Sequence, residues 1–147
     1  MLYNIRYGTG GRRQWPWSGY LGNSCENLEQ IIRFIKGYDP DVVGLVEVDG
    51  GSYRTRRRNQ AHTIGEALGH YNVYESKYGQ GSLVGALPVL NKQGNAFLSR
   101  QTITKQTFHY FRKGVKRLVI ELELEQFTLF LVHLALSHST RQHQLSD

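Results

Sequence analysis

The pattern of apolar and polar positions predicts a mixed α/β domain. Its central segment is residues 42–48, an apolar run of strand length in which Glu47 is the one charged residue. A run without alternation is typical of a strand buried on both faces. An ionised carboxylate beside a dry sheet is costly without a partner. We therefore expect Glu47 to meet either solvent or a cation.

Two segments have the periodicity of helices. The first covers residues 23–36 and the second residues 60–68. In the first segment apolar residues recur at the spacing of one helical stripe: Leu28, Ile31, Ile32 and Ile35. Because glycine commonly follows the last helical turn, we expect these helices to end at Gly37 and Gly69.

The remaining pattern predicts strands and the start of a last helix. Strands are expected at residues 3–5, 71–76, 95–99, 117–125 and 127–132, and a helix begins within 140–147. Residues 117–125 alternate so that one face is apolar and the other acidic, whereas 127–132 is apolar on both faces. The short connection between these two strands predicts an antiparallel hairpin.

Composition indicates one folded domain. The chain has 147 residues, of which 39% are hydrophobic and 20% are charged. Its single cysteine excludes an internal disulfide. No stretch approaches the ~20 apolar residues of a membrane span, and the first residues lack the apolar core of a signal peptide. We therefore expect a cytoplasmic protein.

Basic residues are concentrated in the second half of the chain and in one short run of arginines. The net charge is +6, and residues 76–147 hold 9 Lys and Arg against 4 Asp and Glu. Four arginines follow the 42–48 strand closely: Arg54, Arg56, Arg57 and Arg58. Such a run is either a solvated face or a contact for a phosphodiester backbone. Trp15 and Trp17 likewise either cover the core edge or stack a nucleobase.

Polar residues end two of the predicted buried strands. Glu47 stands near the end of 42–48, and His133 directly follows 127–132. Ligands of α/β sheets collect beyond the carboxyl ends of strands, so these two residues mark a candidate site. Asn4 is unusual within a strand and is either an edge amide or a polar ligand near that site.

Four short motifs in a fixed order resemble those of the endonuclease/exonuclease/phosphatase superfamily, the DNase I-like metal-dependent phosphodiesterases. They lie at residues 3–8, 39–48, 94–100 and 131–134, followed by Arg141 and Gln144. The resemblance implies a four-layer α/β sandwich and hydrolysis of a phosphoester, in DNA, RNA, a lipid or an inositol phosphate. It also implies a Mg²⁺ ion, with Mn²⁺ as the alternative.

The same resemblance assigns roles to individual residues. It implies that Glu47 and Asn4 hold the metal and that His133 is catalytic at the scissile phosphate. Asn95 and Arg6 are expected near the substrate phosphate. Magnesium accepts few protein ligands and keeps several waters, so one carboxylate and one amide are compatible with it.

The family's later motifs, Gly-Asp-x-Asn and an Asp-His pair, have no counterpart in the sequence. We therefore expect residues 1–147 to be the amino-terminal portion of one such domain, inactive alone and prone to self-association. The base that activates water would lie outside it. Two alternatives remain: a non-catalytic nucleic-acid-binding module that uses the arginines, and a scaffold remnant without metal.

Overall fold

The computed structural model describes residues 1–9, 25–77, 90–114 and 116–147. In chain order the elements are β1 (Leu2–Asn4), the 3-10 turn η1 (Arg6–Gly8), α1 (Cys25–Tyr38), β2 (Val42–Asp49), the 3-10 turn η3 (Tyr53–Thr55), α2 (Gln60–Leu68), β3 (Tyr71–Ser76), the 3-10 turn η5 (Leu90–Lys92), β4 (Gln93–Ser99), β5 (Lys105–Tyr110), β6 (Leu118–Glu123), β7 (Thr128–Val132) and α3 (His138–Ser146). The prediction for Trp15 and Trp17 lies outside the described residues.

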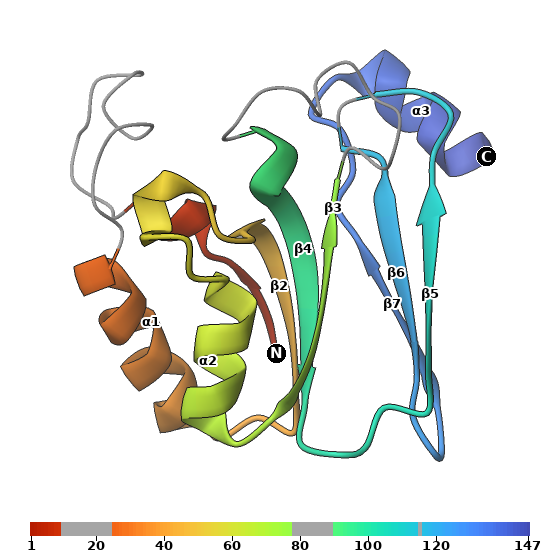
Figure 1. The fold of residues 1–147 in the computed structure, drawn as a ribbon. Helices are drawn as coiled ribbons and strands as arrows, with labels where there is room; N and C mark the ends of the chain where they lie inside the picture. Colours follow the sequence, from red (N-terminus) through yellow and green to blue (C-terminus); the bar gives the residue numbers. More distant parts are fainter. Residues whose placement is uncertain (10–24, 78–89, 115) are drawn as a thin grey trace.

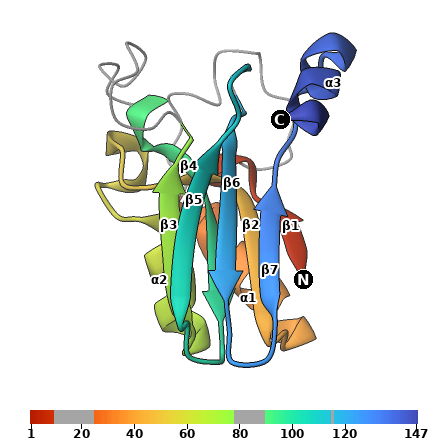
Figure 2. The same ribbon diagram turned by 90° about the vertical axis from the view of Figure 1, so that its right-hand side faces the viewer.

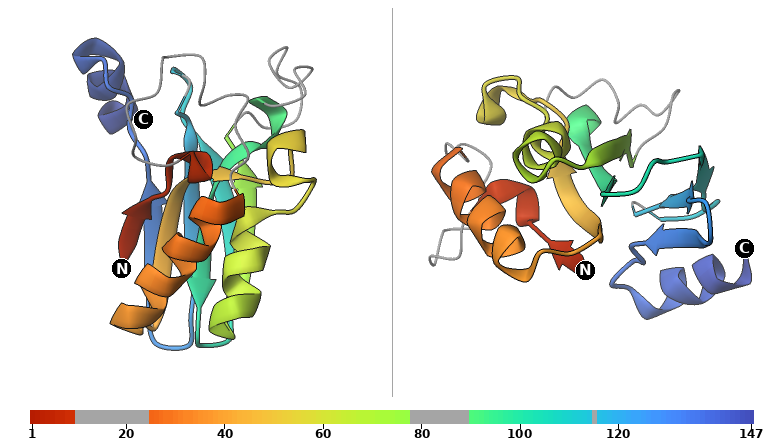
Figure 3. Two further views of the ribbon diagram at one scale, coloured as in Figure 1. Left: turned by 90° about the vertical axis from the view of Figure 1, so that its left-hand side faces the viewer. Right: turned by 90° about the horizontal axis from the view of Figure 1, so that it is seen from below.

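The first sheet has the strand order β1-β2-β4-β3. β1 is parallel to β2, which α1 makes possible by crossing over between them, and the other pairs are antiparallel. Helices α1 and α2 cover one face of this sheet (Figures 1 and 3). The second sheet, β5-β6-β7, covers the other face (Figure 2).

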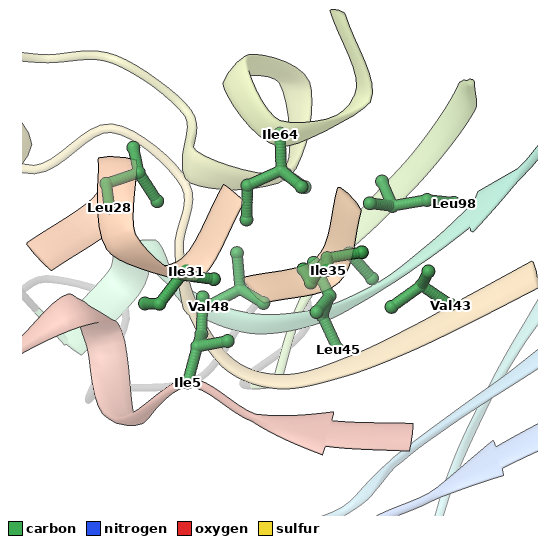
Figure 4. Packing of buried hydrophobic residues seen from close by; sticks show 11 residues of the cluster. Ile5, Leu28, Ile31, Ile35, Val43, Leu45, Val48, Ile64 and Leu98 are labelled. Carbon is green, nitrogen blue, oxygen red and sulfur yellow. The ribbon is translucent and has the colours of Figure 1, made fainter. Parts of the chain in front are cut away.

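A hydrophobic core fills the space between the helices and the first sheet (Figure 4). The predicted stripe of α1 contributes to it: Leu28, Ile31 and Ile35 are buried and Ile32 is partly buried. Each buried Leu or Ile stabilises the fold by about 1.5–3 kcal/mol. Asn59 caps α2 through its side chain, and Gly69 ends the helix at φ 69°, as expected.

A second core lies between the two sheets. It contains Leu118, Ile120 and Leu122 of β6, whose alternate residues Val119, Glu121 and Glu123 are only partly buried. β6 pairs with β7 in an antiparallel hairpin. The predicted alternation and hairpin are therefore confirmed.

Two expectations about individual elements are wrong, and one strand was missed. β7 is not buried on both faces, because it is an edge strand whose Phe130 and Val132 are 59% and 41% exposed. α1 continues through Gly37 to Tyr38, and Asp39 takes the positive φ of 42° that glycine was expected to supply. β5 was not predicted as a strand.

The layers are therefore helices, first sheet and second sheet, which confirms the α/β class. α3 lies at one end of the second sheet (Figure 1). Among the described residues, no helix is long and apolar enough to cross a membrane.

Candidate active site

Glu47 sits on an irregularity of β2. Val46 pairs with Asn95 and Val48 with Gly94, so the register skips Glu47, whose φ is +58°. Without this bulge, alternation would turn Glu47 toward the helix-side core, where Val43 and Leu45 lie. Instead Val48 occupies that core, and the Glu47 side chain stays 21% exposed. The bulge thus delivers the carboxylate to the rim of the sheet.

Asn95 fixes the bulge from the neighbouring strand. It is 4% exposed, and its Oδ1 accepts a hydrogen bond of 3.3 Å from the backbone N–H of Glu47. This bond satisfies a donor that the skipped register leaves outside the strand ladder. Asn95 therefore reaches the candidate site through the backbone of Glu47.

His133 meets Glu47 from the second sheet. Its Nε2 lies 4.0 Å from Oε1 of Glu47 and 2.6 Å from Nζ of Lys116. Burial, and then the charge of Lys116, lower the pKa of His133 below its usual value. Because an ammonium only donates, a neutral His133 accepts this hydrogen bond at Nε2. The two strand-end residues singled out in the sequence are thus brought together.

Sequence reasoning missed Lys116. Its Nζ lies 3.6 Å from Oε1 of Glu47, and its side chain is 22% exposed. The predicted hairpin carried a signal for this position, because the pairing of Val119 with Val132 places the entry of β6 beside His133. A basic residue just before β6 could have been included on that ground.

Lys77 is the second missed residue. It follows β3, and its Nζ donates a hydrogen bond of 3.0 Å to the hydroxyl of Tyr7. Burial lowers the pKa of Lys77 to about 8; the charge of Glu47 acts in the opposite direction, and that of Lys116 lowers the pKa further. No pattern in the sequence indicated that Lys77 belongs to the site, since it is a single charge after a strand.

Asn4 and Arg6 lie at the open edge of the first sheet. Asn4 is aligned with Val46, one residue before Glu47, and its Oδ1 accepts a hydrogen bond of 2.9 Å from the Arg6 backbone. Both residues also line an open pocket against α1 that includes Asn27. The contacts of the described residues do not join either of them to Glu47 or His133.

The four arginines separate into two environments. Arg56, Arg57 and Arg58 are exposed, whereas Arg54 is 5% exposed. The Nη2 of Arg54 lies 2.9 Å from Oδ2 of Asp49, and its guanidinium lies over the ring of Tyr7. Burial therefore removes Arg54 from the surface that the four arginines were expected to share, either as a solvated face or as a contact for a phosphodiester backbone.

The protein groups fit a divalent cation only in part. The described residues contain no group of three or more His, Cys, Asp and Glu side chains that could hold a metal. Glu47 offers a partly exposed carboxylate, and its bulge places it at the rim. Magnesium can take one carboxylate and complete its shell with water and substrate oxygens, so the residues present suit that ion better than zinc.

Comparison with known proteins gives a consistent result. The sequence profile described as "Endonuclease/Exonuclease/phosphatase family" matches residues 1–143. No curated protein matches the chain. Three solved structures share the fold: an endonuclease/exonuclease/phosphatase family protein from Leptotrichia buccalis (TM-score 0.62, 14% identity), one from Beutenbergia cavernae (0.63, 18%) and the human Nocturnin catalytic domain with bound sulfate anion (0.62, 18%).

These likenesses cover nearly all of this chain but only part of the other proteins. The shares of this chain are 99%, 99% and 98%, and the shares of those chains are 60%, 41% and 54%, in the same order. The chain thus spans about half the length of the structures it matches. The likenesses confirm the expected DNase I-like α/β architecture.

Proposed function

The chain belongs to the endonuclease/exonuclease/phosphatase family, and from that membership we propose that it supplies part of a divalent-metal-dependent phosphoester hydrolase. Members of this family are hydrolases of the nuclease and phosphodiesterase type. The observation that carries the proposal is the meeting of Glu47 and His133, from two different sheets, at one rim. Neither side chain belongs to one of the two hydrophobic cores, so core packing does not explain why the two meet.

Each residue has a proposed task. Glu47 holds the metal, Mg²⁺ or Mn²⁺, and the amide of Asn4 completes the protein's share of its shell. When bound, the metal polarises a phosphoryl oxygen and stabilises the leaving group. His133 binds the scissile phosphate, Asn95 keeps Glu47 in place through its backbone, and Arg6 contacts the substrate phosphate from the β1 edge.

We assign catalysis to a complete domain of which residues 1–147 form the amino-terminal portion. The support is the partial coverage of the three solved structures, together with a described site that has one carboxylate. The base that activates the attacking water is placed outside residues 1–147, and these residues alone are expected to be inactive.

The substrate proposed is a nucleic acid. Arg56, Arg57 and Arg58 are exposed and follow the end of β2 that also carries Glu47. Exposed arginines at this place can contact the phosphates that flank a scissile bond. Removing them should weaken binding uniformly across sequences and reduce its dependence on salt.

Two open strand edges support self-association. β1 and β7 are both edge strands, and residues of both line one groove, including Leu2 and Phe130. These two side chains are 69% and 59% exposed. Exposed edges and apolar side chains favour pairing with another chain, so we propose that residues 1–147 alone associate with themselves.

The test is hydrolysis of bis(p-nitrophenyl) phosphate by the full-length gene product with Mg²⁺ or Mn²⁺. Glu47→Gln should lower the rate by about 100-fold or more, because the metal loses its carboxylate. Glu66→Gln changes an exposed carboxylate on α2 and should leave the rate unchanged. Full activity in Glu47→Gln would overturn the assignment.

A further inference from the structure

The connection between β5 and β6 is basic and borders the candidate site. Residues 112–116, which we call the basic turn, include three basic and no acidic side chains. One of the three, Lys116, is paired with Glu47, and its Nζ lies 3.6 Å from Oε1 of that carboxylate. The other two, Arg112 and Lys113, are exposed. They therefore stand beside the site without taking part in its contacts.

The exposed cations of the basic turn differ from those of the adjoining strands. On β5, Nζ of Lys105 lies 2.7 Å from Oε1 of Glu123 on β6. Among the residues that the structure describes, no ion pair includes Arg112 or Lys113. All 12 Asp and Glu residues of the chain belong to the described ranges, so no acidic partner is left elsewhere in it. The two cations are therefore free to meet an external anion.

One carboxylate contacts the backbone of the basic turn. Oδ2 of Asp147 accepts a hydrogen bond of 3.0 Å from the backbone N–H of Arg112. This bond fastens the main chain and leaves the guanidinium outside the contact. Asp147 brings one negative charge against the two positive charges of Arg112 and Lys113, so the exposed part of the turn remains positive.

A buried amide holds the basic turn against α3. Nε2 of Gln144 donates to the carbonyl oxygens of Lys113 at 3.1 Å and Lys116 at 2.7 Å, and its Oε1 accepts from the backbone N–H of Ala135 at 2.9 Å. Gln144 is 2% exposed, so these bonds are sheltered from water. Gly114 has φ +100°, and a Cβ there would lie 2.8 Å from Nε2 of Gln144. The turn thus closes directly on this amide.

A second group of exposed cations lies on the first-sheet side of the site. Arg56, Arg57 and Arg58 follow η3, and η3 and the basic turn lie at the same end of the molecule (Figure 1). Glu47 of the first sheet and His133 of the second meet at this end, with Oε1 and Nε2 4.0 Å apart. A polyanion that crosses these two residues from one sheet to the other can therefore contact cations on both sides.

We propose that Arg112 and Lys113 contact the phosphate backbone of a nucleic acid on the second-sheet side of the scissile bond. The proposal rests on the proposed nucleic-acid substrate and adds a second contact surface for it. Exposed arginine and lysine side chains bind phosphates without reading bases, so they position the strand and add salt-dependent affinity. Because the turn is already held by Gln144, binding loses little conformational entropy there.

An anionic membrane surface also presents phosphate groups, but the neighbouring helix does not suit it. Helices that lie in a membrane interface bury an apolar face. α3 has the sequence HSTRQHQLS, in which Leu145 is the one large apolar residue. Phosphates without an apolar layer are what a nucleic acid offers, so the basic turn fits that partner better.

The experiment measures the binding of a fluorescein-labelled single-stranded oligonucleotide of about 16 nucleotides to the full-length gene product. Fluorescence anisotropy is followed in EDTA, which prevents metal-dependent hydrolysis, over a series of NaCl concentrations. Arg112→Gln/Lys113→Gln should weaken binding by about tenfold at low salt. The slope of log K against log[NaCl] should become shallower by about 1.4, because about 0.7 is lost with each phosphate contact on a single strand.

Two matched variants separate local contact from net charge and from the shape of the turn. Arg33→Gln/Lys36→Gln removes the same charge from exposed positions of α1, which ends where β2 begins, at the far end of the sheet from Glu47. This pair should leave the slope unchanged. Arg112→Lys/Lys113→Arg keeps both charges in the basic turn and should retain the original slope.

Four results would overturn the proposal. They are no binding of the oligonucleotide at low salt, an unchanged slope in Arg112→Gln/Lys113→Gln, an equally shallow slope in the α1 pair, and a loss in the variant that keeps the charges. Vesicles of phosphatidylserine and phosphatidylcholine test the membrane. If Arg112→Gln/Lys113→Gln lost binding to vesicles but kept the oligonucleotide slope, the turn would be a membrane contact and the proposal would be wrong.

This result is separable from the proposed function. Hydrolysis of bis(p-nitrophenyl) phosphate that needs Glu47, with an unchanged oligonucleotide slope in Arg112→Gln/Lys113→Gln, would remove only this contact surface. Oligonucleotide binding that needs the two cations, without metal-dependent hydrolysis by the full-length protein, would remove only the proposed activity.

Discussion

Asp49 and Arg54 form a buried ion pair, with Oδ2 and Nη2 2.9 Å apart and the two side chains 0% and 2% exposed. Asp49 also accepts hydrogen bonds from the backbone of Gly51 and from the backbone and hydroxyl of Ser52. A buried carboxylate with this many donors is well compensated. The pair ties the end of β2 to η3.

Arg54→Ala should lower the free energy of unfolding by about 3–5 kcal/mol, because it leaves the Asp49 charge buried without its cation. Denaturation by urea, monitored by circular dichroism, measures the change. Arg56→Ala should shift the free energy by less than about 0.5 kcal/mol, since Arg56 is exposed. Equal effects of the two substitutions would contradict the burial of Arg54.

Gln144→Ala should destabilise the chain by about 1–3 kcal/mol, because buried partners in Ala135, Lys113 and Lys116 lose their hydrogen bonds. Thermal unfolding compares it with Gln142→Ala, which changes an exposed residue of the same helix. A loss no greater than that of the control would mean that Gln144 does not hold the segment before β6.

Two glycine substitutions should act in opposite directions. A Cβ on Gly94 would lie 2.0 Å from the carbonyl oxygen of Glu75, so Gly94→Ala should cost about 3 kcal/mol or more by forcing β3 away from β4. A Cβ on Gly37 meets nothing within 4 Å, and Gly37→Ala in α1 should gain about 0.5 kcal/mol. Chemical denaturation of both variants measures the difference.

Phe130→Glu should reduce self-association of residues 1–147, because it places a charge on the exposed edge formed by β7. Light scattering over a concentration series should show a mass nearer to that of the monomer than for the unmodified chain. Leu145→Glu is the control, since Leu145 is 66% exposed on α3. A clean monomer without any substitution would refute the association itself.

The apolar pattern predicted most elements because each has a face that must be buried. β2 lies between two cores and α1 carries one stripe, so both were visible in the sequence. β5 was missed because none of its residues is fully buried and only Phe108 and Tyr110 pack on the second core. The exposure of Phe130 was hidden for a related reason: composition does not say which strand is an edge.

The site could be predicted where its residues stand at the ends of strands. Glu47 and His133 were found in this way, and the structure brings them together. Lys116 was missed because its only link to the site is the hairpin register, which places the residues before β6 beside His133. Arg54 was misjudged because its partner, Asp49, looks like any acidic residue after a strand.

The bulge at Glu47 reverses the alternation of side chains along β2. Residues before it alternate in one phase and residues after it in the opposite phase, so Val48 lies in the same core as Val43 and Leu45. If Glu47 were paired regularly, without the bulge, Glu47 would turn toward the helices and Val48 toward the second sheet. The bulge that brings the carboxylate to the rim therefore also keeps the last residues of β2 in phase with the helices, and a change that straightened the strand would displace both side chains at once.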